Sequence, residues 1–249
     1  MRLRTAYATA AVALLAAGCG SSSGTSTSAS SKSGKLTVFG ASSLSKVLPK
    51  IHSAAYSFGG SDTLETQIKQ GAPADVFAAA APKQTTALYK AGLASKPVTF
   101  ATNTLVMIVP KSNPAHIKRV SDVTRPGVKI VVCEASQPCG TYASGAFKSL
   151  GITKAATKNV VSKEANVSQV VAQIAAGEGD VGFVYITDAK TAANKVTPIK
   201  LPAKAKPKTK DTVSVVKASK NQAAAKAYVK ALSTPAAQKQ LQAAGFGKP

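Results

Sequence analysis

The sequence predicts an α/β fold built on mainly parallel β-sheets flanked by helices. Short runs rich in β-branched and aromatic residues alternate with alanine-rich segments whose apolar residues recur at helical spacing. The connections between successive runs leave room for the helix that joins parallel strands. Small and hydroxyl-bearing residues follow several of the runs, at the points where helices begin.

The order of the elements follows from this alternation. In the first predicted helix, Leu44, Val47 and Leu48 recur at helical spacing, and Val167, Val170 and Val171 do the same in a later one. The predicted strands are 35–40, 54–58, 75–79, 104–109, 128–133, 181–185, 196–200 and 212–216. The predicted helices are 43–51, 63–70, 82–91, 140–150, 167–176, 222–232 and 235–243.

The N-terminus has the layout of an export signal. Arg2 and Arg4 precede an apolar run, residues 6–17, that is too short to span a bilayer. The following Leu15-Ala-Ala-Gly-Cys19 resembles a bacterial lipoprotein cleavage box, which implies a signal peptide over 1–18 and a lipidated Cys19. The alternative is a signal that is cut nearby without lipidation.

The remaining cysteines fit an exported protein. Residues 19–34 comprise Cys19 and a run of small and polar residues that predicts a flexible tether. Cys133 and Cys139 would meet an oxidising environment, and we expect a disulfide between them. Two cysteines without a nearby histidine do not complete a zinc site.

The charge is strongly basic, with 32 Lys and Arg against 10 Asp and Glu and a net charge of +22. Aromatic residues are only 5% of the chain and Trp is absent, which argues against nucleic-acid binding. We interpret the lysines, densest over 200–210, as a solvated surface that attracts anions, or alternatively one that adheres to an anionic envelope.

Two turns have the chemistry of an anion site. Each of the segments 36–44 and 57–64 ends a β-type run in small residues and places a serine, Ser43 or Ser61, where a helix begins. Unpaired backbone N–H groups, the helix dipole and a hydroxyl donor converge at such a point. The simpler interpretation is that both serines are ordinary N-caps, and for either turn alone it is the favoured one.

Three later segments offer further donors. A helix begins near Gly140, which would let the chain approach a ligand closely, and Asn166 is expected to cap the next helix. Tyr185 ends a buried-type strand, where its hydroxyl can reach a ligand at the carboxyl edge of the sheet. Each of these features, taken alone, is more often structural than functional.

In combination and order, these segments resemble the molybdate-binding proteins that serve ABC importers. The resemblance extends from about Lys35 to Gly247. The segments that carry it are Val38-Phe-Gly-Ala-Ser-Ser-Leu44, Ser57-Phe-Gly-Gly-Ser61, Gly71-Ala-Pro-Ala-Asp-Val-Phe77, Gln137-Pro-Cys-Gly140 and Val184-Tyr-Ile-Thr-Asp188.

The resemblance implies a type II periplasmic-binding fold, with two lobes joined by a hinge and the anion between them. Residues 35–104 and 211–249 would form lobe 1, and residues 105–210 would form lobe 2. The ligand would be held by the hydroxyls of Ser43, Ser61 and Tyr185 and by the backbone N–H groups of Ser43, Ser61, Cys139 and Val167.

It also implies an extracytoplasmic receptor, held to the outer face of the cell membrane by its lipid alone. The receptor would be a monomer with no cofactor that delivers molybdate or tungstate to an ABC permease. Alternatives are the same fold binding another oxyanion such as sulfate, or a basic envelope protein that has lost ligand binding.

The chemistry of such a site is consistent with the sequence. A tetrahedral dianion needs many donors and no acceptors, so the lysines are expected to lie outside the pocket. An enzyme is not expected, because there is no G-x-S-x-G elbow and because His52 and His116 lie in unremarkable surroundings.

Two features depart from the family. The crossover over 41–53 is about a dozen residues shorter than usual, close to the minimum for parallel strands, which leaves the support of the first lobe in question. Asp62 follows Ser61 where the family commonly has an uncharged residue, and we expect its carboxylate to point outward.

Overall fold

The computed structural model describes residues 35–205 and 207–249. The predicted signal peptide, Cys19 and the tether lie outside the described residues. The described part is a mixed α/β structure, which confirms the predicted fold class. Its strands are β1 Thr37–Ala41, β2 Ala55–Gly59, β3 Val76–Ala79, β4 Val98–Pro110, β5 Ile130–Cys133, β6 Val160–Glu164, β7 Val181–Tyr185, β8 Val196–Lys200 and β9 Lys208–Val215.

The helices lie between the strands in the alternating order that the sequence predicts. The α-helices are α1 Leu48–Ile51, α2 Ser61–Lys69, α3 Pro82–Lys90, α4 Pro138–Leu150, α5 Thr153–Lys158, α6 Val167–Ala176, α7 Ile186–Thr191, α8 Gln222–Ala231 and α9 Pro235–Ala244. The described residues also form the short 3-10 helices η1 Ser42–Leu44, η2 Val120–Thr124 and η3 Ala203–Ala205.

The strands pair in the order β2-β1-β3-β9-β4-β7-β5-β6, and β8 also pairs with β4. Pairing is parallel among β1, β2 and β3 and again among β5, β6 and β7. It is antiparallel wherever β4 or β9 takes part. We call the part built on β1–β3 the first lobe and the part built on β5–β8 the second lobe.

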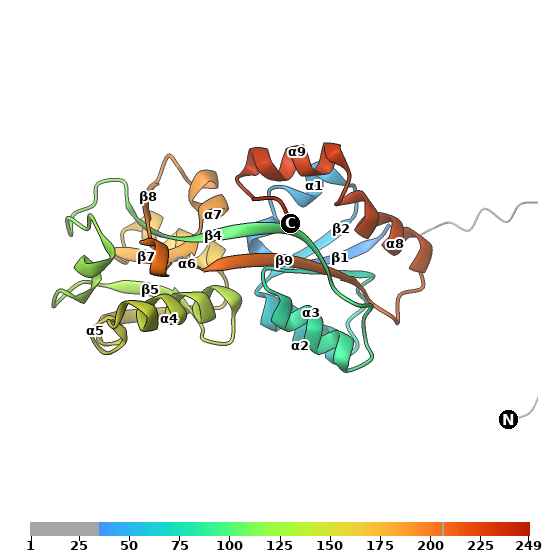
Figure 1. The fold of residues 1–249 in the computed structure, drawn as a ribbon, viewed down its shortest axis with the longest axis horizontal. Helices are drawn as coiled ribbons and strands as arrows, with labels where there is room; N and C mark the ends of the chain where they lie inside the picture. Colours follow the sequence, from blue (N-terminus) through green and yellow to red (C-terminus); the bar gives the residue numbers. More distant parts are fainter. Residues whose placement is uncertain (1–34, 206) are drawn as a thin grey trace, which may run out of the picture. The chain divides into compact units, whose positions relative to one another are not determined.

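Strands β4 and β9 connect the two lobes and run side by side between them (Figure 1). Residues Val98 to Thr104 of β4 pair with β9, whereas Leu105 to Pro110 pair with β7 and β8. The predicted strand, 104–109, covered only the apolar end of β4. Its first half carries polar residues such as Thr99 and Asn103 and gives no strand signal on its own.

The short crossover between β1 and β2 forms two short helical pieces, so the prediction of one continuous helix over 43–51 is wrong. Pro49 lies in the first turn of α1, where its missing N–H costs nothing, but it could not lie inside a longer helix. Leu44, Val47 and Leu48 are nevertheless fully buried. The Tyr56 hydroxyl donates to the carbonyl of His52, the residue after α1, at 2.6 Å and so ties the crossover to β2.

Three elements of the second lobe, β6, α5 and α7, are absent from the sequence prediction. Strand β6 alternates half-buried and exposed residues and includes two charged ones, Lys163 and Glu164. Helices α5 and α7 span six residues each, which is too short for a periodic signal. They fill out the second lobe without changing its fold class.

Most of the buried apolar residues form one cluster that extends through both lobes and includes Leu105 and Met107 of β4. A smaller cluster lies under α2 and α3 and includes Leu64, Phe77 and Leu88. In the first lobe, α2 and α3 lie on one side of the sheet and α1 and α9 on the other (Figure 1). Packing of the helices against the sheet thereby fixes the positions at which helices begin after the strands.

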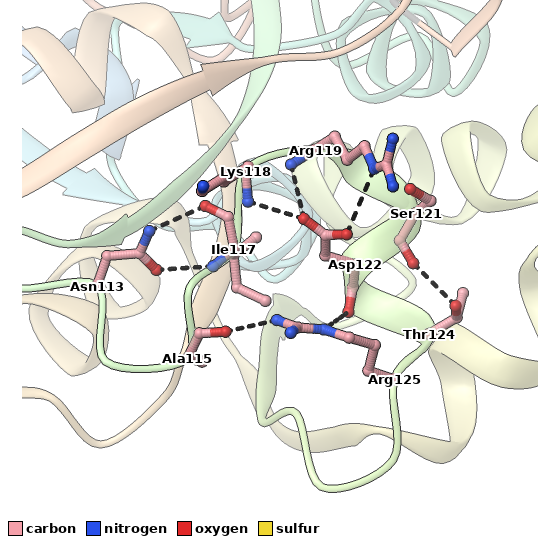
Figure 2. Close-up of polar contacts among 9 residues, drawn as sticks. All are labelled: Asn113, Ala115, Ile117, Lys118, Arg119, Ser121, Asp122, Thr124 and Arg125. Atoms are coloured by element: carbon pink, nitrogen blue, oxygen red, sulfur yellow. Dashed lines mark hydrogen bonds and ion pairs between the residues drawn. The ribbon is translucent and has the colours of Figure 1, made fainter.

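The segment between β4 and β5 is held together by its own polar contacts, as Figure 2 shows. The Asp122 carboxylate accepts the N–H groups of Lys118 and Arg119 at 2.8 and 3.0 Å, and these bonds, led by that from Lys118, lower the pKa of Asp122. The Asn113 side chain closes a turn on Ile117 in the same way. This segment lies away from the pocket described below.

Within the described residues, no helix combines the length and the hydropathy that crossing a membrane requires.

Candidate functional site

The five residues that the sequence singles out as ligands lie together in one pocket between the lobes. The space that protein atoms leave free in it, part of which is open to solvent, is about 200 Å³. The part of it that the centre of a water molecule can occupy is about 10 Å³, far below the roughly 300–1,000 Å³ of pockets for drug-sized molecules. The lining residues are Ala41, Ser42, Ser43, Gly59, Gly60, Ser61, Ala80, Gln137, Pro138, Cys139, Asn166, Val167 and Tyr185.

The two serines do not cap helices, so the simpler interpretation of both turns is wrong. Ser43 lies within η1, and its buried Oγ has no hydrogen-bond partner among residues 35–205 and 207–249. Ser61 is the first residue of α2, after the N-cap Gly60, and its Oγ accepts the Ala80 N–H at 3.1 Å. The Ser61 hydroxyl therefore keeps its hydrogen free for a ligand.

Tyr185 ends β7 and is almost fully buried against the pocket, at 1% exposure. Its hydroxyl also lacks a partner in the part of the chain that the structure describes. Burial, followed by the nearby Asp211, raises the pKa of Tyr185 well above its ordinary value. The group thus stays a phenol, and a phenol can donate a hydrogen bond to an anion.

Backbone donors come from the starts of two helices in the second lobe. Cys139 is in the first turn of α4 and Val167 is the first residue of α6, so neither N–H has an acceptor within its own helix. Asn166 caps α6 as predicted, accepting the Gln169 N–H at 3.3 Å. The positive ends of both helix dipoles lie at the pocket.

The predicted disulfide between Cys133 and Cys139 is present, with Cα atoms 5.7 Å apart. It ties the end of β5 to the first turn of α4 and so fixes the Cys139 N–H beside the pocket. The expectation that Gly140 lets a ligand approach is wrong. A side chain at Gly140 would collide with the carbonyl oxygens of Cys133 and Glu134, so this glycine serves the packing of the disulfide loop.

No charged side chain lines the pocket, among the residues that the structure describes. The lysines lie outside it, as predicted, and so does Asp62, which occupies the first turn of α2 and is partly exposed. Within that same part of the chain, no group of three or more His, Cys, Asp or Glu residues could hold a metal ion. The side chains that line the pocket are therefore neutral.

Two buried carboxyl groups lie behind Tyr185. Asp188 accepts the Tyr185 N–H at 3.1 Å, and burial raises the pKa of Asp188 to about 7. Asp211, on β9, has no hydrogen-bond partner within the described ranges, and burial together with Asp188 raises the pKa of Asp211 well above its ordinary value. In their neutral forms, neither opposes a negative charge in the pocket.

Sequence reasoning missed Gln137 as a site residue. The side chain is 1% exposed, lines the pocket, and reaches from the second lobe to the start of α2. Its place directly before Pro138, the first residue of α4, was the one available signal. The histidines do not complement the serines: His52 packs edge-on against Tyr228, and His116 is exposed.

Comparison with known proteins places this geometry in a family. A family model described as a bacterial extracellular solute-binding protein matches residues 36–247. The molybdate-binding protein ModA of Mycobacterium tuberculosis is 38% identical over 195 residues, covering 78% of this chain and 73% of the relative. ModA of Haemophilus influenzae is 29% identical over 231 residues, covering 86% and 90%.

Solved structures agree with the sequence relatives. A chain from Clostridium difficile that is described as the substrate-binding domain of a molybdenum ABC transporter has a TM-score of 0.64 at 30% identity, with 86% of this chain and 98% of that chain covered. The periplasmic molybdate-binding protein of Azotobacter vinelandii has a TM-score of 0.77 at 24% identity, covering 86% and 100%, and supports the fold. The chain belongs to the family of bacterial extracellular solute-binding proteins.

Proposed function

We propose that this chain is the extracytoplasmic receptor of an ABC importer, binding molybdate, and tungstate nearly as well, for delivery to the permease. The observation that carries the proposal is the pair of buried hydroxyls of Ser43 and Tyr185. Within the part of the chain that the structure describes, they have no hydrogen-bond partner and line a small pocket without charged side chains. A buried hydroxyl without a partner is costly, and an anion in the pocket would remove that cost.

The donor set suits a dianion that carries no proton. The proposed ligands are Ser43, Ser61 and Tyr185 through their hydroxyls, and Ser43, Ser61, Cys139 and Val167 through their N–H groups. These groups lie on both lobes, so the complete set exists only when the lobes are together. Phosphate is partly protonated near neutral pH and would need an acceptor that this set does not offer.

The choice of molybdate rests on the relatives. The chains of Mycobacterium tuberculosis and Haemophilus influenzae are both described as molybdate-binding proteins, and the Clostridium difficile domain is described as part of a molybdenum ABC transporter. Sulfate has the same charge and shape, so discrimination against it would rest on the size of the cavity. Molybdate and tungstate would share that size.

Isothermal titration with molybdate, tungstate, sulfate and phosphate tests the proposal. We expect one molybdate per chain, tungstate of similar affinity, and no measurable heat from phosphate. Tight binding of sulfate alone would replace molybdate by sulfate as the ligand. Absence of binding by any of the four, together with salt-dependent adsorption to anionic polymers, would favour an envelope protein without a ligand.

We also propose that residues 35–104 with 211–249, and residues 105–210, are the two lobes, and that lipidated Cys19 anchors a monomer to the outer face of the membrane. The change of partner along β4 at Thr104 and Leu105 supports the boundary. Metabolic labelling with a fatty acid, compared between the wild type and Cys19→Ser, tests the anchor. An equal label on both would refute it.

A further inference from the structure

The buried side chain of Gln137 joins the two lobes at the rim of the pocket. Its Oε1 accepts the backbone N–H of Asp62 at 3.2 Å, and its Nε2 donates to Oγ1 of Thr63 at 3.1 Å. Gln137 belongs to the second lobe, while Asp62 and Thr63 belong to the first turn of α2 in the first lobe. Both ends of one carboxamide are therefore used across the boundary between the lobes.

Gly60 makes this approach of the lobes possible. Its φ and ψ, −65° and 136°, suit any residue, so its backbone does not require glycine. A Cβ at this position would lie 2.5 Å from Oε1 and 2.6 Å from Cδ of Gln137, and closer still to the carbonyl oxygen of Ala165. These nearest atoms all belong to the second lobe. The absent side chain thus leaves space for the other lobe.

We propose that Gln137 and Gly60, with the Asp62 N–H and the Thr63 hydroxyl, form a latch that holds the lobes closed and slows release of the ligand. This inference rests on the proposed function, because it concerns how long the bound anion is retained. The latch bonds cross between lobes, so they stabilise the closed state alone and shift the equilibrium between open and closed forms toward it.

The latch also affects the charge pattern of the pocket. The Gln137 Oε1 is a strong acceptor within the lining, and a free acceptor would repel the oxygens of a dianion. Its bond with the Asp62 N–H occupies that oxygen. The remaining first-turn donor at the pocket, the Ser61 N–H, is left for the ligand.

The decisive variant is Thr63→Val, because Thr63 is exposed, does not line the pocket and keeps its shape in valine. We expect the dissociation rate of molybdate to rise severalfold and the association rate to change little, as is usual when a closed-state contact is lost. Thr63→Ser, which keeps the hydroxyl, should restore the wild-type rate. A dissociation rate of Thr63→Val equal to that of the wild type would refute the contribution of the Thr63 hydroxyl to the latch.

Gly60→Ala tests the clearance between the lobes. We expect small-angle scattering to show no compaction of this variant on addition of molybdate, whereas the wild type compacts. Gly145→Ala is the matched control, because Gly145 lies in α4 with nothing within 4 Å of the added Cβ. Thermal unfolding of the free variants confirms that each one is folded. Compaction of Gly60→Ala to the wild-type extent would contradict the proposal.

Hydrogen exchange of the Asp62 amide tests the latch in the absence of any ligand. This amide is in the first turn of α2 and has no acceptor within the helix, so its protection must come from Gln137. In the free wild type the molecules whose lobes are closed protect this amide, so we expect slower exchange than in Gln137→Ala or Gly60→Ala. Equal exchange in all three overturns the latch, whereas a wild type that binds no molybdate but keeps this difference overturns only the proposed function.

Discussion

Two buried polar regions of the molecule differ in whether they are complete. Around Asp75 in the first lobe, the carboxylate accepts the Thr37 N–H at 2.7 Å and also takes bonds from the side chains of Ser219 and Asn221. In the pocket, the oxygens of Ser43 and Tyr185 have no partner among the described residues. A structural cluster satisfies itself, whereas a ligand site keeps donors for what it binds.

The two most buried tyrosines repeat the contrast. Tyr228 is fully buried, and its hydroxyl lies 3.3 Å from the hydroxyl of Tyr56, which in turn donates to the His52 carbonyl at 2.6 Å. Tyr185 is nearly as buried, at 1% exposure, but its hydroxyl has no partner within the described ranges. Burial alone therefore does not distinguish these two tyrosines, whereas the hydrogen bonding of their hydroxyls does.

The largest effect on stability is expected from Asp75→Ala. The change would leave three buried or half-buried donors without their acceptor and should lower the free energy of unfolding by roughly 3 kcal/mol. Urea denaturation measures this loss. Because Asp75 is not among the pocket residues, titration should give an unchanged molybdate affinity. A large loss of affinity would contradict the distinction between the two regions.

Tyr185→Phe should have the opposite profile. A hydrogen bond to a charged partner is worth about 1.5–3 kcal/mol, so molybdate affinity should fall roughly 10- to 100-fold. The free variant should be at least as stable as the free wild type, because the removed hydroxyl is buried and has no partner among residues 35–205 and 207–249. Titration and thermal unfolding of the same samples give both values. Lower stability with unchanged affinity would make Tyr185 a structural residue.

The pH dependence of stability tests the buried acids behind the pocket. Asp188 has a pKa of about 7 in the folded protein against an ordinary 3.8, so between these values the unfolded chain is ionised while the folded one keeps its proton. Stability should therefore fall as pH rises from about 4 to about 7, by at most about 1.4 kcal/mol per pH unit. The raised pKa of Asp211 acts in the same direction.

Asp188→Asn should flatten this profile, since an amide oxygen can still accept the Tyr185 N–H but cannot ionise. Unfolding in urea at a series of pH values provides the measurement. A decline as steep as that of the wild type would mean that Asp188 titrates near its ordinary value.

The smallest effect is expected from Tyr228→Phe, the counterpart of the Tyr185 variant. Loss of its bond to Tyr56 should lower stability by about 1 kcal/mol and leave molybdate affinity unchanged. Thermal unfolding and titration compare it with Tyr185→Phe. Similar profiles for both variants would remove the contrast between the tyrosines.

Local features of the sequence were sufficient to predict much of the fold. Strands that end in small residues and helices that begin at Ser61, Pro138 and Val167 are marked by neighbouring residues, and the structure brings these starts to one pocket. The break in the first helix was also present locally, as Pro49, but the apolar spacing around it was given more weight. A proline signal should prevail over periodicity in so short a segment.

What the sequence could not supply depends on contacts between distant segments. The bonds of Gln137 to Asp62 and Thr63 join residues more than 70 positions apart, and neither segment contains a local signal that identifies the other as its partner. The same holds for the unpaired oxygen of Tyr185, because pairing is a property of the folded surroundings. Strand β6 and the polar half of β4 form because neighbouring strands supply their partners.

The central claim is that neutral hydrogen-bond donors on both lobes hold a doubly charged oxyanion. A crystal structure with molybdate, located by the anomalous scattering of molybdenum, tests it most directly. The account predicts the metal atom between the lobes, with its oxygens within hydrogen-bond distance of Ser43, Ser61 and Tyr185. Density at a surface lysine with an empty pocket would contradict it.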